Sequence, residues 1–277
     1  MIQRQEAPPL RQGVRQEQRV SRRVRARTAG ELGVSIGSTL LLLVVWELLV
    51  RAEVLDSRFF PAPTEVIRTL FEMIRSGLLL TDVWVTLVRV LIGFALGSAF
   101  GIVLGLVMGL SRIVRAALMP MVGAIYPIPK IAVLPLVMLI FGLGDTSRYV
   151  VVAIGVFFLV QLNAMAGVMS IENIYLDVGK NFGASRLDVL RTIALPGALP
   201  LVFTGLRLGW GTGLLLIVAA EFLGAREGLG YLIWNAWQTF AVDEMYVGLL
   251  AISVIGLVSF GLFDLVEKRV VPWRSER

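Results

Sequence analysis

The chain contains neither cysteine nor histidine, and charged residues are scarce for a length of 277 residues. Without cysteine it cannot form a disulfide framework, a thiolate metal site or a cysteine nucleophile. Without histidine it lacks the usual general base and the commonest metal ligand. Enzymatic chemistry would depend on carboxylates, hydroxyls and amines, and we expect no catalytic residue, metal site or cofactor in this chain.

Apolar residues make up 57% of the chain and charged residues 17%, and the mean hydropathy is +0.80. This is the composition of a membrane protein. A helical span needs about 20 apolar residues to cross roughly 30 Å of hydrocarbon. The sequence therefore predicts an all-α polytopic protein with six transmembrane helices, at about 33–50, 83–110, 117–141, 149–170, 197–223 and 246–266.

The segment 1–32 is basic, with eight arginines among polar residues. It has too few large apolar residues to bury a core, so we expect a disordered cytoplasmic tail. Arginines beside a first span set the orientation of the protein in the membrane and attract anionic lipid. We favour this role for the tail over nucleic-acid binding. A basic region before an apolar run also resembles a signal peptide, but no small-x-small cleavage site follows Val50, and we expect the span to be retained.

Lysine and arginine are distributed unequally between the predicted connections. One face, formed by both termini and the connections 111–116 and 171–196, carries 17 of these residues, whereas the opposite face carries six. Cytoplasmic segments carry the excess of positive charge. Both termini and the segment 171–196 are therefore predicted to lie in the cytoplasm.

Glycines occupy every fourth position from Gly93 to Gly109 in the second predicted span. The fifth span repeats the pattern at Gly205, Gly209 and Gly213. Small residues at this spacing let another helix backbone approach closely, which matters in lipid because no hydrophobic force drives helix association there. We expect tight helix packing along both ridges.

The third predicted span contains Pro127, Pro129 and Pro135, each of which removes a backbone hydrogen bond and kinks a helix. Carbonyls freed in this way are tolerated where protein or a water-filled cavity meets them, so we expect this span to line a pathway. Structural kinking without a pathway is the alternative.

Charged residues within spans are functional candidates because they are costly to bury in lipid. Pairing or snorkelling is the alternative, which we prefer for Glu47. The positive charges make an anionic solute plausible. The pathway candidates are Pro127, Pro129, Lys130, Arg89, Arg207 and Glu221.

Residues 171–196 form a polar interruption between two apolar spans. Ile171, Ile174, Val178 and Phe182 recur at helical spacing and predict a short surface helix. Gly183 suits the left-handed position that ends a helix, and Ser185 with Asp188 predicts a capping box that starts a second short helix. That helix should close near 195–196, where a proline is tolerated in the first turn of the next helix.

This segment resembles the cytoplasmic EAA loop of binding-protein-dependent ABC importer permeases. Gly183, Ile193, Leu195 and Pro196 stand at the matching spacing, whereas Asp177-Val178-Gly179 replaces the opening Glu-Ala-Ala. The resemblance implies that the segment couples to an ATPase, with a contact set of Asp177, Gly183, Ala184, Ser185, Arg186, Ile193, Leu195 and Pro196.

Stretches such as YPIPKIAVLPL, FGLGDTSR, GLRLGWG and GLGYLIW are similar to the nitrate, sulfonate, taurine and bicarbonate group of these permeases. The resemblance implies a type I importer permease fold, a homodimer in the bacterial inner membrane, two cytoplasmic ATPase subunits and an extracytoplasmic solute-binding protein. No Walker-type phosphate loop occurs, so ATP and magnesium belong to the ATPase partner. A small anion such as a sulfonate, taurine or nitrate is the expected solute.

Two other functions deserve comparison. The residues Gly142-Leu143-Gly144-Asp145 match the G-x-G-D pattern of intramembrane aspartyl proteases, whose chemistry needs two neighbouring carboxylates. We expect Asp145 in an outer loop with no second aspartate at its depth. A secondary transporter or channel would also explain kinked helices and buried charge, but the halves show no convincing self-similarity.

Overall fold

The computed structural model describes residues 34–273, apart from the side chains of Asn173, Leu176, Lys180 and Arg186. The expected tail at 1–32 lies outside the described residues. The chain forms two compact units, residues 1–65 and 66–277. In the first unit, the helix Val34–Arg51 has the length and composition of a span. Its Glu47 accepts a hydrogen bond from Arg51 Nε at 2.7 Å, so the expected pairing of this carboxylate is confirmed.

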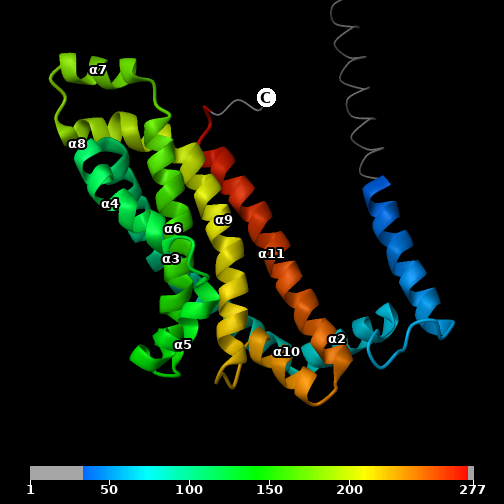
Figure 1. The fold of residues 1–277 in the computed structure, drawn as a ribbon. Helices are drawn as coiled ribbons and strands as arrows, with labels where there is room; N and C mark the ends of the chain where they lie inside the picture. The colour runs from blue at the N-terminus through cyan, green and yellow to red at the C-terminus, as the bar shows by residue number, and fades with distance from the viewer. Residues whose placement is uncertain (1–33, 274–277) are drawn as a thin grey trace, which may run out of the picture. The chain divides into compact units, whose positions relative to one another are not determined.

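Helices make up the regular structure of residues 34–273, and no strand occurs there (Figure 1). Helix Val34–Arg51, the bent pair α4–α5 and four long helices account for the six expected spans, which confirms the all-α fold. The labelled helices are α2 (Pro63–Ser76), α3 (Leu78–Leu110), α4 (Arg112–Ile125), α5 (Lys130–Phe141), α6 (Asp145–Met169), α7 (Asn173–Asn181), α8 (Arg186–Val189), α9 (Leu195–Phe222), α10 (Leu229–Gln238) and α11 (Val242–Val270).

Helix α6 is the centre of the second unit, because both α3 and α9 pack along it. Val152 and Val156 of α6 are fully buried in one cluster with Val90 of α3 and Ile217 of α9. Within this unit, α7 and α8 lie at one end and α10 lies at the other (Figure 1). We refer to these as the α7 end and the α10 end.

The glycine ridge of α3 lies directly against α6, as expected. A Cβ atom added at Gly97 would lie 2.5 Å from the carbonyl oxygen of Ala153, and one at Gly105 would lie 2.5 Å from that of Gln161. On α9, a Cβ at Gly205 would lie 2.7 Å from Asn163 Cβ. Side chains at these positions would force the backbones apart, so glycine permits the contact.

The third expected span is not one kinked helix. It is the pair α4 and α5, bent by 95° at the break between Ile125 and Lys130. Pro127 and Pro129 lie in this break, whereas Pro135 lies inside α5. Each of the two prolines lacks an N–H and also disfavours the helical region for the residue before it. A single proline would bend the helix, but two prolines among the four residues of the break end it.

The expected two-helix arrangement at the α7 end is correct, but its second helix does not stop at Pro196. Helix α8 continues through a π-helical turn, Leu190–Ala194, directly into α9, so that Leu187–Phe222 is one continuous span. Pro196 lacks the N–H that an α-helix would direct at Thr192. The wider turn just before this proline accommodates it without a break.

Candidate functional site

The segment expected to contact an ATPase has a turn that depends on Gly183. This residue has a φ of +74°, in the left-handed region, and open space surrounds the position that a Cβ would occupy. Just beyond it, the N–H of Ala184 donates to the carbonyl of Gly179 at 2.9 Å, which closes the end of α7. The chain thus turns sharply between α7 and α8, as the sequence predicted.

Ser185 and Asp188 form the predicted capping box. The N–H of Asp188 donates to Ser185 Oγ at 3.2 Å, and the N–H of Ser185 donates to Asp188 Oδ2 at 3.0 Å. The serine hydroxyl also donates to the same carboxylate oxygen at 2.6 Å. Two backbone donors at the start of α8 are therefore satisfied reciprocally.

Helix α7 presents apolar side chains outward. Ile174, Val178 and Phe182 are exposed, with Phe182 at 87% of its maximum. Asp177 is also exposed. Ile193 and Leu195 are half-buried, and the side chain of Arg186 lies outside the described residues. The structure therefore gathers an apolar surface on α7 and the residue that follows it, next to the turn at Gly183.

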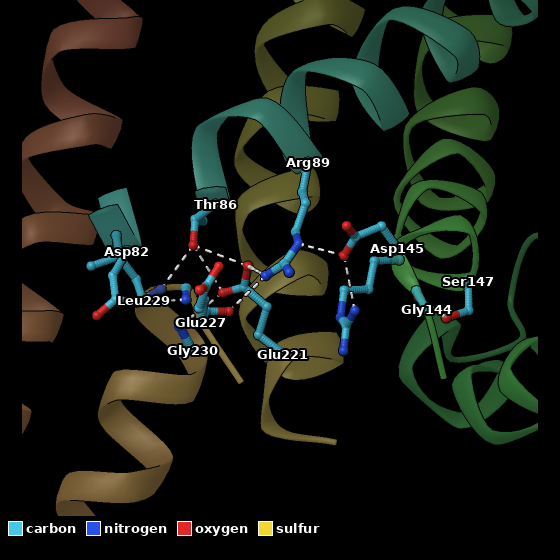
Figure 2. A network of polar contacts seen from close by, with 12 residues as sticks. Asp82, Thr86, Arg89, Gly144, Asp145, Ser147, Glu221, Glu227, Leu229 and Gly230 are labelled. Atoms are coloured by element: carbon cyan, nitrogen blue, oxygen red, sulfur yellow. Dashed lines mark hydrogen bonds and ion pairs between the residues drawn. The ribbon is translucent and has the colours of Figure 1, made fainter. Parts of the chain in front are cut away.

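At the α10 end, Arg89 and Glu221 meet in a buried polar network (Figure 2). Arg89 Nη1 donates to Glu221 Oε1 at 2.9 Å and to the carbonyl oxygen of Glu227 at 2.7 Å. Arg89 Nε donates to Asp145 Oδ1 at 2.8 Å. One side chain of α3 thus joins the start of α6, the end of α9 and the connection before α10.

The first turn of α10 is held by side chains of other helices. The N–H of Gly228 donates to Asp82 at 2.7 Å, and the N–H of Leu229 donates to Thr86 Oγ1 at 2.8 Å. The N–H of Gly230 donates to Glu221 Oε2 at 2.9 Å. Helix termini leave such donors unsatisfied within the helix, so this network docks α10 onto α3 and α9.

Lys130 lies at the first residue of α5, and not half-way along a helix as its sequence position had indicated. Its Nζ donates to the carbonyl oxygens of Ile125, Tyr126 and Ile128, at 3.1, 2.9 and 2.8 Å. The ammonium also lies 4.8 Å from the ring centroid of Phe158. Lys130 therefore satisfies three carbonyls at the break between α4 and α5, where the two prolines interrupt the helical hydrogen bonds.

Arg207 pairs with two carboxylates of α11. Its Nη2 contacts Asp264 and Glu267, while its Nε is buried without a partner. Helix α11 has few buried residues, so this ion pair and the packing of Phe263 on Trp210 attach it to α9. Each of the three expected pathway cations thus has partners within the chain.

Sequence reasoning missed Thr86 and Arg148, and it placed Asp145 in a loop. Asp145 is instead the first residue of α6, and Oδ1 of this carboxylate accepts from both Arg89 and Arg148. Asp145 directly follows Gly144, and an acidic residue is favoured in the first turn of a helix, so the sequence could have predicted a helix start here. Arg148 follows three positions later, one turn further along the same helix face. Two arginines, and no second carboxylate, bond to Asp145 among residues 34–273, which is unlike a protease dyad.

Comparison with known proteins gives consistent results. Residues 97–272 match the family described as "Binding-protein-dependent transport system inner membrane component". The chain is 34% identical to a taurine transport system permease protein of Escherichia coli strain K12, over 92% of this chain and 96% of that one. It is 36% identical to a riboflavin transport system permease protein of Chloroflexus aurantiacus, over 93% and 97%. A structure of the MetNI methionine ABC transporter matches the fold with a TM-score of 0.58 at 20% identity, over 70% of this chain and 96% of that one.

Proposed function

Because the chain belongs to the family of binding-protein-dependent transport system inner membrane components, we propose that it is the permease of an ATP-driven importer for an organic sulfonate such as taurine. The permease forms the route through the membrane and hydrolyses no ATP itself. ATP and magnesium bind to a separate ATPase partner. An importer subunit explains a helical segment outside the core better than a secondary transporter or channel does.

The observation that carries the proposal is the geometry of the α7 end. Exposed Ile174, Val178 and Phe182 form an apolar surface, which is costly to leave in water. Gly183 and the capping box form the turn that joins α7 to α8. A groove on an ATPase subunit covers this surface, and closure of the ATPase pair on ATP moves α7 with it.

The displacement reaches the membrane through α8 and α9, which form one continuous span from Leu187 to Phe222. Rigid-body motion of packed elements is a common form of switching, because interfaces have discrete stable arrangements. The complete importer contains two copies of this chain, two ATPase subunits and an extracytoplasmic binding protein. The excess of positive charge supports an orientation in which the α7 end and both termini face the cytoplasm of a bacterial cell and the α10 end faces outside.

The six pathway candidates take different parts in this proposal. Pro127, Pro129 and Lys130 form the bend between α4 and α5, where irregular backbone lines the solute route. Arg89, Glu221 and Arg207 hold the helices of the wall in place. Their charges are already paired, so they do not supply free positive charge to a solute.

The coupling role is tested by co-expressing the tagged chain with the ATPase encoded beside its gene and comparing wild type with Gly183→Asp. The variant places a charged side chain at the turn in a left-handed conformation, so we expect loss of ATPase co-purification or of its stimulation. Gly77→Asp is the matched control, because Gly77 has a φ of +80°, equally open surroundings and a position just before α3. Equal loss in both variants, or no loss in either, overturns the coupling role.

The solute is tested by uptake into proteoliposomes that contain the complete importer. We expect ATP-dependent uptake of taurine and no uptake of riboflavin. Uptake of riboflavin alone contradicts the sulfonate assignment while leaving the importer assignment intact. Solute movement by the chain without an ATPase contradicts the importer assignment itself.

A further inference from the structure

Arg148 is buried near the start of α6, and two of its three guanidinium nitrogens are unused. Its Nη1 donates to Asp145 Oδ1 at 3.0 Å, whereas Nε and Nη2 are buried without a hydrogen-bond partner. The side chain is only 4% exposed. A buried donor without a partner costs free energy, and in a membrane span an ionisable residue of this kind indicates function.

The two unused nitrogens form one recognition edge. In a planar guanidinium, the N–H of Nε and one N–H of Nη2 point in the same direction, and this fork matches two oxygens of a carboxylate, phosphate or sulfonate. Arg89 already uses its Nε and Nη1, and Lys130 donates to three carbonyls. Among the arginines of residues 34–273, Arg148 is the one whose Nε and Nη2 are both buried without a hydrogen-bond partner.

Asp145 offers the complementary charge beside this fork. Both of its arginine partners bind Oδ1, and Oδ2 accepts no hydrogen bond from the described part of the chain. The carboxylate is about half exposed, at 47%. An unused carboxylate oxygen and an unused guanidinium edge therefore lie on two residues that already contact each other.

The charge of the surrounding network favours a solute without net charge. Arg89 and Arg148 balance Asp145 and fully buried Glu221, and half-buried Asp82 adds a further carboxylate. A lone anion would enter next to these carboxylates, with a repulsion that the low dielectric of the interior strengthens. A zwitterion brings one charge of each sign and avoids this cost.

We propose that Arg148 and Asp145 form the recognition pair for a zwitterionic aminosulfonate, with the sulfonate on Nε and Nη2 of Arg148 and the ammonium on Oδ2 of Asp145. The proposal rests on the importer function and narrows its solute class from sulfonates in general to aminosulfonates. Because the fork is buried in the described conformation, the solute reaches it in another conformation of the cycle. Alternating exposure of this kind is what a transporter requires.

The test measures binding of radiolabelled taurine and ethanesulfonate to the permease–ATPase complex in phosphatidylcholine nanodiscs, without the binding protein. Ethanesulfonate lacks the ammonium group of taurine and is otherwise its close analogue. We expect wild type to prefer taurine, and Asp145→Asn to reduce that preference roughly 10- to 100-fold, the range for hydrogen bonds to charged groups. Arg148→Gln should lose both solutes by a similar factor, and Arg148→Lys should recover part of the affinity.

The matched controls are Arg58→Gln and Asp56→Asn, which make the same chemical changes in an exposed ion pair outside the spans. Both should bind taurine as wild type does. Unchanged taurine binding by Arg148→Gln overturns the proposal, and so does an equal loss of both sulfonates in Asp145→Asn, since that pattern indicates a purely structural role. Loss of taurine binding to wild type when phosphatidylglycerol is added overturns it too, because the fork then holds a lipid phosphate.

A separate measurement distinguishes this proposal from the importer function. ATPase activity of the wild-type complex is measured with taurine-loaded binding protein encoded beside the permease. If the loaded binding protein stimulates the ATPase but the Arg148 and Asp145 variants bind taurine as wild type does, the importer function stands and only the recognition pair is overturned. Absence of stimulation by any sulfonate-loaded binding protein overturns the proposed function, and the recognition pair falls with it.

Discussion

Arg89 and Glu221 are separated by 132 positions in the sequence, yet Nη1 of the arginine lies 2.9 Å from the carboxylate of the glutamate. Glu221 is fully buried and accepts from Thr86, Arg89 and the N–H of Gly230. A buried carboxylate is tolerated when it is paired and its remaining lone pairs are satisfied. The ion pair therefore joins α3, α9 and α10 at a point where an unpaired charge would be costly.

Replacing Glu221 by glutamine should destabilise the permease strongly. The change leaves Arg89 without its buried counter-ion, and removal of one partner from such a pair costs about 3–5 kcal/mol. Thermal unfolding of the purified protein in nanodiscs measures the loss. Glu72→Gln is the control, because Glu72 pairs with Arg68 at 3.0 Å on the surface, where an ion pair contributes about 0–1 kcal/mol. Equal shifts for the two variants would contradict the interpretation.

Adding a single methyl group to the α3 ridge should weaken its packing on α6. Gly97→Ala places a Cβ 2.5 Å from the carbonyl oxygen of Ala153, and overpacking of this kind costs about 1–3 kcal/mol. Gly256→Ala in α11 meets nothing within 4 Å, so it should be neutral or stabilising through better helix propensity. Resistance to unfolding by heat or by detergent distinguishes the two, and a Gly97→Ala protein as stable as wild type contradicts the close contact.

Removal of the capping box should loosen α8 without unfolding the membrane bundle. Ser185→Ala removes the hydroxyl that caps the helix, at a cost of about 0.5–2 kcal/mol in local stability. Hydrogen exchange of the amides at 186–190 should become faster, and ATPase stimulation should fall in parallel. Ser253→Ala is the control, because its hydroxyl bonds only the carbonyl of Leu249 one turn earlier in α11. Unchanged exchange at 186–190 would show that the box adds nothing to α8.

Replacing Lys130 by methionine should destabilise the break between α4 and α5. The change keeps much of the apolar volume but removes the donor for three carbonyl oxygens, and a hydrogen bond to a charged group contributes about 1.5–3 kcal/mol. Thermal unfolding in nanodiscs measures the loss. Arg226→Met, which removes an exposed cation between α9 and α10, should have no such effect. Equal stability of Lys130→Met and wild type would show that the carbonyls find other partners.

Periodicity and local chemistry predicted much of this fold. The spacing of glycines identified the helix face that contacts α6, and Gly183 with Ser185 and Asp188 identified a turn and a helix start correctly. These features depend on neighbours within a few residues, which the sequence displays directly. The spans themselves were predictable because only long apolar helices satisfy the backbone in lipid.

Contacts between distant segments were not predictable in the same way. The sequence around Arg89 does not indicate that Glu221 is its partner, because the pairing depends on how α3 and α9 are rotated against α6. The role of Lys130 was missed because two prolines end a helix just before it. Lys130 therefore lies at the start of α5 and not in the middle of a span. Arg148 was missed because its position near the end of a predicted span hides its burial.

The contact of α3 with α6 has a mechanical consequence. From Gly93 to Gly109, atoms of one helix fill the notches of the other over four turns, so the two helices cannot slide past each other by part of a residue. They form one stiff lever, with α7 attached at one end and the carboxylate of Asp145 at the other. A tilt imposed at the α7 end would therefore move Asp145 and Arg89 together.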